Sequence, residues 1–386
     1  MKILIIGPAH PLRGGIASST ERLGKEFLNE GHEVTIYTFS LQYPSFLFPG
    51  TSQFSTEPAP EGININACIN SINPFNWLKI GNRIKKMKPD LLVVRFWLPF
   101  MGPCLGTILR RVKKNRHTKI VCVVDNMVPH EKRFGDKPFT KYFVKPVDAF
   151  VGMSEKVIKD IQLFAKEKPT RYVPLPLFDN LGEKISKQEA RKFLGISDEQ
   201  RVVLFFGFIR KYKGLDLLLD AVKILKDKSA TLPTNRALGA ANCVTIIAGE
   251  FYEDRKPYDE QIEALGIRDR LMLRTDFIPG SEVKYYFCAA DLVIQPYKNA
   301  TQSGVTPVAY HFEKPMVVTN VGGLPDQVPD GRAGLVAEPN AESLAEKIIQ
   351  YFEKGEDYFI PMLLEEKKKF SWSNMTKSIL ELTQSI

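Results

Sequence analysis

The stretch that decides the fold is Asp291–Gly323, which reads DLVIQPYKNATQSGVTPVAYHFEKPMVVTNVGG. Its apolar run Leu292–Gln295 is short and ends at a proline, as expected of a strand buried in a parallel sheet. Pro315–Thr319 is a second run of the same kind, and Val305–Phe312 between them can form a two-turn helix. The stretch therefore predicts a strand, a helix and a second strand, which is the repeating unit of a parallel α/β sheet.

Small polar residues and glycines connect these elements. Asn299–Gly304 reads NATQSG, the composition of a loop and a helix start, and Gly322-Gly323 closes the second strand. Exposed N–H groups at a helix N-terminus favour an anion, so the arrangement suits phosphate binding. The alternative is an ordinary βαβ unit with well-made turns, and the stretch by itself leaves both interpretations open.

Strands alternate with helices on both sides of this stretch. Apolar runs predict strands at Lys2–Ile6, Glu33–Thr38, Leu91–Arg95, Lys119–Val124, Ala149–Met153, Arg201–Phe206, Val244–Ala248 and Leu271–Arg274. Helices are predicted at Ser18–Asn29, Asn76–Met87, Leu105–Lys114, Glu155–Lys166, Gly214–Lys226, Pro257–Leu265, Glu282–Ala289 and Ala341–Lys354. The alternation predicts an α/β protein with two Rossmann-like, doubly wound parallel-sheet domains, each with its ligand crevice at the carboxyl ends of the strands.

The boundary between the two domains is predicted within Tyr172–Asn180, YVPLPLFDN, where two prolines among apolar residues suit an extended linker. We place the first domain at residues 1–175 and the second at residues 176–369. Residues 370–386 form one more helical pattern after the second domain is complete. A length of 386 residues agrees with two domains.

The composition is that of an ordinary soluble globular protein, with 44% hydrophobic and 25% charged residues. No apolar run is long enough to span a bilayer, and the N-terminal MKILIIGPAH suits a first buried strand better than a signal segment. The five cysteines are scattered, without a CxxC pair or a His/Cys cluster. This predicts reduced core thiols, no structural zinc and a cytoplasmic protein.

The chain is basic, with a net charge of +9, and its lysines and arginines gather at Arg83–Lys88, Arg110–Arg116 and Lys132-Arg133. Such an excess can attract nucleic acid, an anionic membrane surface or a phosphorylated ligand, although solvated helix faces explain each cluster too. No nucleic-acid-binding motif accompanies the charge. We therefore expect no nucleic-acid partner and a weak attraction to the inner face of the membrane.

Candidate site residues lie in four loops that follow predicted strands: Gly14-Gly15, Asp125–Glu131, Gly207–Gly214, and Asn299–Gly304 with Gly322-Gly323. In the third loop, Arg210, Lys211 and Lys213 come just before a helix start, where cations repel the helix dipole. A bound anion would remove this repulsion. The loop therefore predicts a phosphate site, with a solvated loop as the alternative.

Short motifs follow one another along nearly the whole chain: Gly14-Gly15, Gly31–Val34 (GHEV), Phe206–Asp216 (FGFIRKYKGLD), Gly249-Glu250, Ala290-Asp291, Val321–Asp326 (VGGLPD) and Asp330–Val336 (DGRAGLV). In order and spacing they resemble the retaining GT-B glycosyltransferases of family 4, or group 1, which use nucleotide-sugar donors. The resemblance implies two domains that face each other across a cleft, with the acceptor on the first and the donor on the second. It also implies that the final helix, with Trp372, packs back on the first domain.

The resemblance further implies sugar transfer from a UDP- or GDP-sugar to a glycan or a lipid-diphosphate-linked glycan, with retained configuration, in cell-surface polysaccharide assembly. No cofactor is implied, and the lack of a suitable DxD pair agrees with a GT-B enzyme that needs no metal. The implied catalytic candidates are Arg210, Lys213, Asp125 and His130. The donor-binding candidates are Gly14, Gly15, Gly207, Glu250, Thr301, Gln302, Ser303, Gly304 and Val305.

The chain departs from the family pattern where the family has two glutamates. These positions hold Ala300 and Val308, whose side chains accept no hydrogen bond. The nearest polar replacements are Thr301, Gln302 and Ser303, whose N–H groups could still hold a diphosphate. Recognition of the ribose and the sugar must therefore come from other groups.

Two further positions depart from the pattern. An arginine of the family's phosphate loop falls on Phe208, with Arg210 the nearest substitute, and a histidine of the family falls on Asp125. His130 follows a few residues later and is equally well explained as a surface histidine. The acceptor is expected near these residues of the first domain and near His10, Arg13 and the loop Leu41–Glu61.

Two other interpretations stay open. The missing glutamates suit a non-catalytic relative that binds nucleotide or glycan as a partner subunit. A different GT-B reaction, such as that of a sugar epimerase or a phosphorylase, is the third, although the pyridoxal lysine site of a glycogen-type phosphorylase is not found in the sequence. The intact phosphate loops favour an enzyme, because a scaffold would have little use for them.

Overall fold

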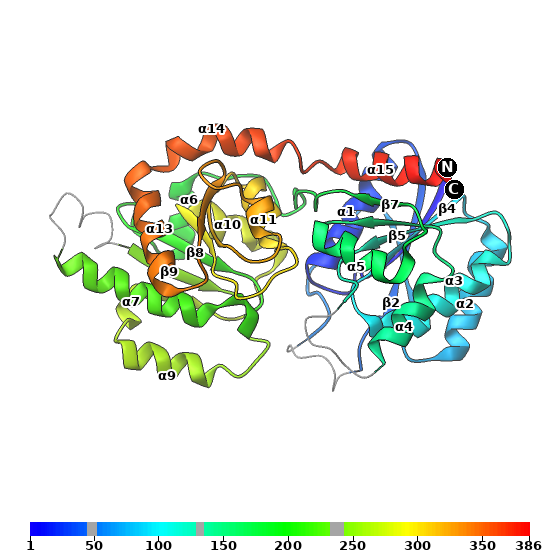
Figure 1. Cartoon of the computed structure of the whole chain (residues 1–386), viewed down its shortest axis with the longest axis horizontal. Helices are drawn as coiled ribbons and strands as arrows, with labels where there is room; N and C mark the ends of the chain where they lie inside the picture. The colour runs from blue at the N-terminus through cyan, green and yellow to red at the C-terminus, as the bar shows by residue number, and fades with distance from the viewer. Residues whose placement is uncertain (45–51, 129–134, 232–242) are drawn as a thin grey trace. The chain divides into compact units, whose positions relative to one another are not determined.

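The computed structural model describes residues 1–44, 52–128, 135–231 and 243–386. The chain divides into two compact units: unit 1 is Met1–Pro176 with Ser371–Ile386, and unit 2 is Leu177–Phe370 (Figure 1). The sequence placed this boundary after residue 175 and began the final segment at residue 370. His130 and part of the loop Leu41–Glu61 lie outside the described residues.

Unit 1 is built on a parallel sheet whose described strands lie in the order β3-β2-β1-β4-β5-β6-β7. They are β1 (Lys2–Ile6), β2 (Glu33–Leu41), β3 (Asn64–Asn70), β4 (Leu91–Phe96), β5 (Lys119–Val124), β6 (Ala149–Gly152) and β7 (Thr170–Tyr172). Every residue of β4 is buried, as expected of a strand covered on both faces. The chain winds from β1 to β3 and then returns to the other side of β1, so the switch point lies between β1 and β4.

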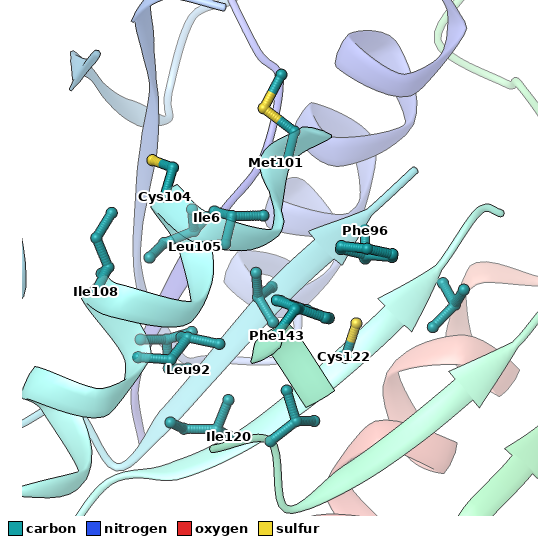
Figure 2. Packing of buried hydrophobic residues seen from close by; sticks show 14 of the residues in the cluster. Ile6, Leu92, Phe96, Met101, Cys104, Leu105, Ile108, Ile120, Cys122 and Phe143 are labelled. Carbon is teal, nitrogen blue, oxygen red and sulfur yellow. The ribbon is translucent and has the colours of Figure 1, made fainter. Parts of the chain in front are cut away.

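Helices cover both faces of this sheet: α1 (Gly15–Asn29), α2 (Pro74–Met87), α3 (Gly102–Lys113), α4 (Asp136–Val144), α5 (Glu155–Ala165) and α15 (Trp372–Ser385). α2, α3 and α4 pack side by side, while α1 packs against α15, which also contacts β5 and β6. Side chains from α2 to α5 and from alternate strand residues form one buried core (Figure 2). Within it, Phe96 stacks on Phe143 with 4.1 Å between ring centroids.

The last helix, α15, packs on unit 1 after the chain has completed unit 2. Its Trp372 and Ile379 side chains are buried, and the Arg22 guanidinium lies 5.4 Å from the centroid of the Trp372 ring. Arg171 and Glu381 add an ion pair between β7 and this helix. α15 is therefore a structural part of unit 1.

Unit 2 is built on a second parallel sheet, whose described strands lie in the order β10-β9-β8-β11-β12-β13. They are β8 (Arg201–Phe206), β9 (Cys243–Ala248), β10 (Leu271–Arg274), β11 (Leu292–Gln295), β12 (Met316–Thr319) and β13 (Gly334–Ala337). The switch point lies between β8 and β11. The predicted fold class, two Rossmann-like parallel-sheet domains, is confirmed.

The helices of unit 2 are α6 (Lys187–Leu194), α7 (Leu215–Thr231), α9 (Lys256–Leu265), α10 (Val283–Ala289), α11 (Val305–His311), α12 (Leu324–Gln327), α13 (Ala341–Lys354) and α14 (Glu356–Lys367). The sequence missed α6, α12 and α14, as well as β3, β7 and α4 of unit 1. Of the helices in the described ranges, none has the length and apolar character needed to cross a membrane.

Candidate functional site

The loops that follow β8 and β11 meet at the switch point of unit 2. β8 ends at Phe206, and the following Gly207 has a φ of 97°, in the region that favours glycine. A Cβ on Gly207 would lie 3.0 Å from Lys213 Nζ and 3.7 Å from a methyl carbon of Val305. The predicted phosphate loop and the start of α11 therefore bring these three residues into contact.

Lys213 is a cation without an anionic partner among the described residues. It ends the 3-10 turn η3 (Lys211–Lys213), and its Nζ lies 5.7 Å from the centroid of the Tyr297 ring. Burial, with a smaller contribution from the charge of Arg210, lowers the pKa of Lys213 from 10.5 to about 7. Across the described ranges, neither Lys213 nor Arg210 forms an ion pair with a carboxylate. An anion bound here would stabilise the charged form of the lysine.

Close backbone packing fixes this loop against the loop after β11. Gly214 has a φ of 68°, and a Cβ on it would lie only 1.9 Å from the Pro296 carbonyl oxygen, so the position requires glycine. The Lys298 N–H donates to the Tyr212 carbonyl at 2.7 Å, and the Lys298 ammonium pairs with Asp216. These contacts hold the cations at a fixed place beside the sheet edge.

Part of the backbone of the loop Asn299–Gly304 is already hydrogen-bonded to side chains of the protein. Thr301 and Ser303 are buried. The Ser303 N–H donates to Gln327 Oε1 at 3.2 Å, and the Val305 N–H donates to Ser303 Oγ at 3.1 Å. Two of the amides in the predicted diphosphate site are therefore already hydrogen-bonded within the protein.

The positions of the family's glutamates are occupied by buried apolar side chains, Ala300 and Val308. A Cβ on Gly322, which has a φ of 55°, would lie 1.7 Å from the Ala300 carbonyl oxygen, so the turn after β12 packs directly on this loop. Gln302 is half-buried and Gly304 is exposed. These two residues form the outward-facing part of the loop.

Aromatic rings line the same sheet edge toward β9 and β10. Phe208, at the position of the family's arginine, stacks on Tyr252 with 4.2 Å between centroids and lies 6.4 Å from Phe277. The Arg210 guanidinium lies 5.2 Å from the Tyr252 ring. Glu250 is buried, and its carbonyl accepts a backbone N–H from the phosphate loop at 2.8 Å. Flat rings beside a guanidinium suit a planar ligand next to an anionic one.

The carboxyl edge of the unit 1 sheet carries the start of α1. This helix begins at Gly15 rather than at Ser18, because Gly14, with a φ of 108°, turns the chain into it. Among the residues described around this end, no side chain caps the helix, and its first turn holds no acidic residue. The end is therefore open to water or to an anion.

A buried ion pair lies beside this helix start, at the switch point of unit 1. Arg95, on β4, donates from Nε and a terminal nitrogen to both carboxylate oxygens of Asp125, with 3.0 Å for the Nε bond. Its other terminal nitrogen donates to Ser19 Oγ on α1 at 3.0 Å. A Cβ on Gly7 would lie 2.8 Å from the Arg95 side chain, so this glycine leaves room for the arginine. The pair connects β4, the loop after β5 and α1.

Two family models match the two halves of this chain. Glycosyltransferase Family 4 matches residues 13–176, and Glycosyl transferases group 1 matches residues 186–360. The first match lies in unit 1 and the second in unit 2. The chain belongs to the GT-B glycosyltransferases.

Curated relatives of this glycosyltransferase include D-inositol 3-phosphate glycosyltransferases. The one from Corynebacterium urealyticum is 27% identical over 53% of this chain and 48% of its own length. The one from Thermobifida fusca is 24% identical over 84% of this chain and 77% of its own length. The chain therefore spans about half the length of the first relative and about three quarters of the second.

Solved structures share the fold of the glycosyltransferase. Anabaena Alr3699/HepE in complex with UDP-glucose superposes with a TM-score of 0.72 at 16% sequence identity, covering 100% of both chains. At this identity the likeness establishes the fold and does not identify the substrates.

The structure places the predicted residues of the glycosyltransferase in two groups. Lys213 and Val305 both lie beside Gly207 in unit 2, and Arg210 and Glu250 lie on the same sheet edge. The loop residues Thr301, Gln302, Ser303 and Gly304, of which only Gly304 is exposed, adjoin them. Unit 1 holds Gly14, Gly15 and Asp125, while His130 is outside the described residues. The roles of all of them stay predictions.

Three residues of the site escaped the sequence analysis. Arg95 could have been found, because a charged residue inside the apolar run LLVVRF needs a buried partner. The Tyr297 hydroxyl lies 3.2 Å from Ser303 Oγ, and Gln327 accepts from the Ser303 N–H. No sequence pattern indicates these last two contacts, because they depend on how the loops after β11 and β12 pack together.

Proposed function

We propose that this chain transfers a sugar from a UDP- or GDP-sugar to a glycan or a lipid-diphosphate-linked glycan, with retained configuration, in cell-surface glycan assembly. The observation that carries the proposal is the pair of cations Arg210 and Lys213, without carboxylate partners in the described part of unit 2. They lie beside the β8–β11 switch point, where open α/β sheets bind their ligands. A bound diphosphate would supply the negative charge that pairs with these two cations.

The departing nucleoside diphosphate gains negative charge as the bond to the sugar breaks. Lys213 and Arg210 stabilise that charge more strongly in the transition state than in the bound donor, which accelerates the reaction. Because a neighbouring anion raises the pKa of a lysine, Lys213 is protonated when the donor is bound. In this proposal the two side chains take the place of a divalent metal.

The remaining parts of the donor and the acceptor are assigned by chemistry. The stacked rings of Phe208 and Tyr252 suit the flat nucleobase. The acceptor is assigned to unit 1, where Arg95 holds Asp125 in one orientation beside the open start of α1. HepE, which has the same fold, binds UDP-glucose in its solved structure, and this supports a donor of that class. The site of action is the cytoplasm, at its membrane face.

A second candidate is a non-catalytic relative that binds a nucleotide or a glycan. It is favoured by Ala300 and Val308, which leave the donor sugar without the family's carboxylates. In that case nucleotide binds through the same cations, but no sugar is released.

A thermal-shift series with UDP, GDP, ADP and TDP, followed by hydrolysis assays on the matching nucleotide sugars, separates these candidates. Binding to the folded state raises the midpoint of unfolding in proportion to occupancy. The proposal expects one nucleotide to stabilise the protein and its sugar conjugate to release it slowly. Binding without release, with a full set of acceptors present, supports the relative. No response to any nucleotide overturns both.

A further inference from the structure

One part of unit 1 carries more positive charge than the whole chain. Residues 71–124 contain twelve lysines and arginines and a single acidic residue, Asp90, which gives this stretch a net charge of +11 against +9 for the full sequence. The Asp90 carboxylate accepts the Lys2 N–H at 2.7 Å and contacts the His117 ring at 3.1 Å. The stretch therefore contains almost no negative charge of its own to balance its lysines and arginines.

The outward stripe of α2 concentrates these cations on one side. Ile80 and Ile84 face the core, while Phe75, Lys79 and Lys86 are exposed at the spacing of a single helix face. Within the described residues, neither of the two lysines contacts a carboxylate. The outer face of α2 thus combines an aromatic ring with unpaired cations.

α3 and α4 continue this face. Glycines bring the three helices close together: a Cβ on Gly81 of α2 would lie 2.7 Å from Arg111 Cβ, and one on Gly106 of α3 would lie 2.7 Å from the Tyr142 ring of α4. The Arg110 guanidinium lies 3.6 Å from the centroid of that ring. We give the name basic face to exposed residues of these helices and of the positions next to their ends: Ile72, Phe75, Lys79, Lys86, Lys114, Lys137, Phe139, Lys141, Tyr142 and Lys145.

Large apolar side chains stand among the cations of the basic face. Phe75 is 84% exposed and Ile72 is 49% exposed, while Phe139 and Tyr142 are each a little over one third exposed. An exposed aromatic and an aliphatic side chain beside lysines suit the interface of a bilayer, where rings enter the acyl boundary and ammonium groups meet lipid phosphates. A nucleic acid would contact the lysines and stack on the aromatic rings, but it would not bury an aliphatic side chain such as Ile72.

We propose that the basic face binds the surface of an anionic lipid bilayer and holds unit 1 at the membrane without crossing it. The attraction combines the charge of the lysines with burial of Phe75 and Ile72. It goes beyond the proposed sugar transfer, because it requires neither donor nor acceptor.

The first test is sedimentation with vesicles at low salt. Vesicles of phosphatidylcholine with about 30% phosphatidylglycerol should bind the protein, and vesicles of phosphatidylcholine alone should not. The triple variant K79Q/K86Q/K114Q should bind the anionic vesicles about 100-fold more weakly. A matched control, K192Q/K256Q/K368Q, removes three exposed lysines of unit 2 and should bind like the parent.

The second test concerns the apolar part of the face. Phe75→Ser removes an exposed side chain without touching the core, and it should weaken binding about tenfold even at salt concentrations that screen the lysines. Equal binding to neutral and anionic vesicles, or a triple variant that binds like its control, overturns the proposal. So does binding of single-stranded RNA with no binding to vesicles. Nucleotide thermal shifts should be the same in all of these variants, so the outcome is independent of the proposed enzyme activity.

Discussion

The two units have the same sheet topology around their switch points, and each holds a cation there. The two cations differ in whether a carboxylate compensates their charge. In unit 1 the cation at the switch point, Arg95, is neutralised by Asp125 and anchored to Ser19. In unit 2 the cation, Lys213, faces a glycine and an aromatic ring, and its pKa is lowered to about 7. A cation shielded from water with a carboxylate partner is part of the framework, whereas a shielded cation without one is stabilised when an anionic ligand binds. The comparison shows that charge compensation distinguishes two sites that topology makes alike.

The largest effect should come from removing the compensated cation. Arg95→Met leaves the Asp125 carboxylate without its main partner in a nearly closed environment, and we expect a loss of about 3–5 kcal/mol in the free energy of unfolding. Urea denaturation measures this. The double variant Arg95→Met/Asp125→Leu should recover much of the loss, since no charge is then left unpaired.

A control for this prediction is the exposed ion pair on α7. Lys223→Met removes the partner of Asp227 at the surface, and it should cost about 0.5 kcal/mol or less. An Arg95→Met protein as stable as this control would show that unit 1 does not depend on its ion pair.

Removing the uncompensated cation should affect function and spare the fold. Lys213→Met should lower kcat/KM for the nucleotide sugar by about 10²–10³-fold, the usual effect of losing one donor that stabilises a developing anion. Its free energy of unfolding should not fall, because a cation without a carboxylate partner is lost. Steady-state kinetics and thermal unfolding measure the two effects.

Lys211 is the matched control in the same loop. Its side chain is exposed, and Lys211→Met should change kcat/KM by less than about twofold. Equal losses in the two variants would indicate a general electrostatic effect and would remove the distinction between the two switch points.

The backbone contact that holds Lys213 in place should also be sensitive. Gly214→Ala and Gly195→Ala both put a side chain on a residue with positive φ, which costs about 1–2 kcal/mol. At Gly214 the new Cβ also collides with the Pro296 carbonyl, and we expect about 2–3 kcal/mol beyond the cost at Gly195, where the Cβ meets no neighbour within 4 Å. Nucleotide binding should be lost only at Gly214. Equal stability of the two variants in denaturation would contradict the packing of the two loops.

Taken per pH unit, the smallest effect is a pH dependence. Between pH 7 and 10.5 the unfolded chain keeps the proton of Lys213 while the folded protein has lost it, so the free energy of unfolding should rise with pH in this window. Affinity for a nucleoside diphosphate should fall over the same window, by at most about tenfold per pH unit, because the anion needs the charged lysine. Calorimetric titrations from pH 7.5 upward, where the phosphates are fully ionised, should show this trend in the parent protein and not in Lys213→Met.

The sequence predicted the fold because apolar runs of the central strands are unambiguous. β1, β5, β8 and β11 have the predicted bounds, and each lies between two strands in the interior of its sheet, where helices cover both faces. β3 (NINACIN) was missed because it lies at the sheet edge, where alternate polar residues face solvent. α14 was missed because Pro361 interrupts its pattern.

The sequence predicted those parts of the site whose residues lie close together along the chain. The glycines and cations of the phosphate loop lie within eight residues, Gly207–Gly214. Their order in the sequence is therefore enough to predict an anion-binding site. The contact between Ser303 and Gln327 joins a loop to the helix α12, and the pairing of Arg95 with Asp125 joins β4 to the loop after β5. Such contacts follow from strand order and loop packing, which the sequence specifies only through the whole fold.

The placement of α15 also bears on how the protein is made. Unit 1 buries Trp372 and Ile379 from the last sixteen residues, Ser371–Ile386, so its first 176 residues leave an apolar strip uncovered during synthesis. A ribosome releases those sixteen residues only after all of unit 2 has emerged. Unit 1 therefore reaches its final packing only after unit 2 has been synthesised, and a nascent chain stalled before residue 371 should be a client of chaperones that bind exposed apolar surface.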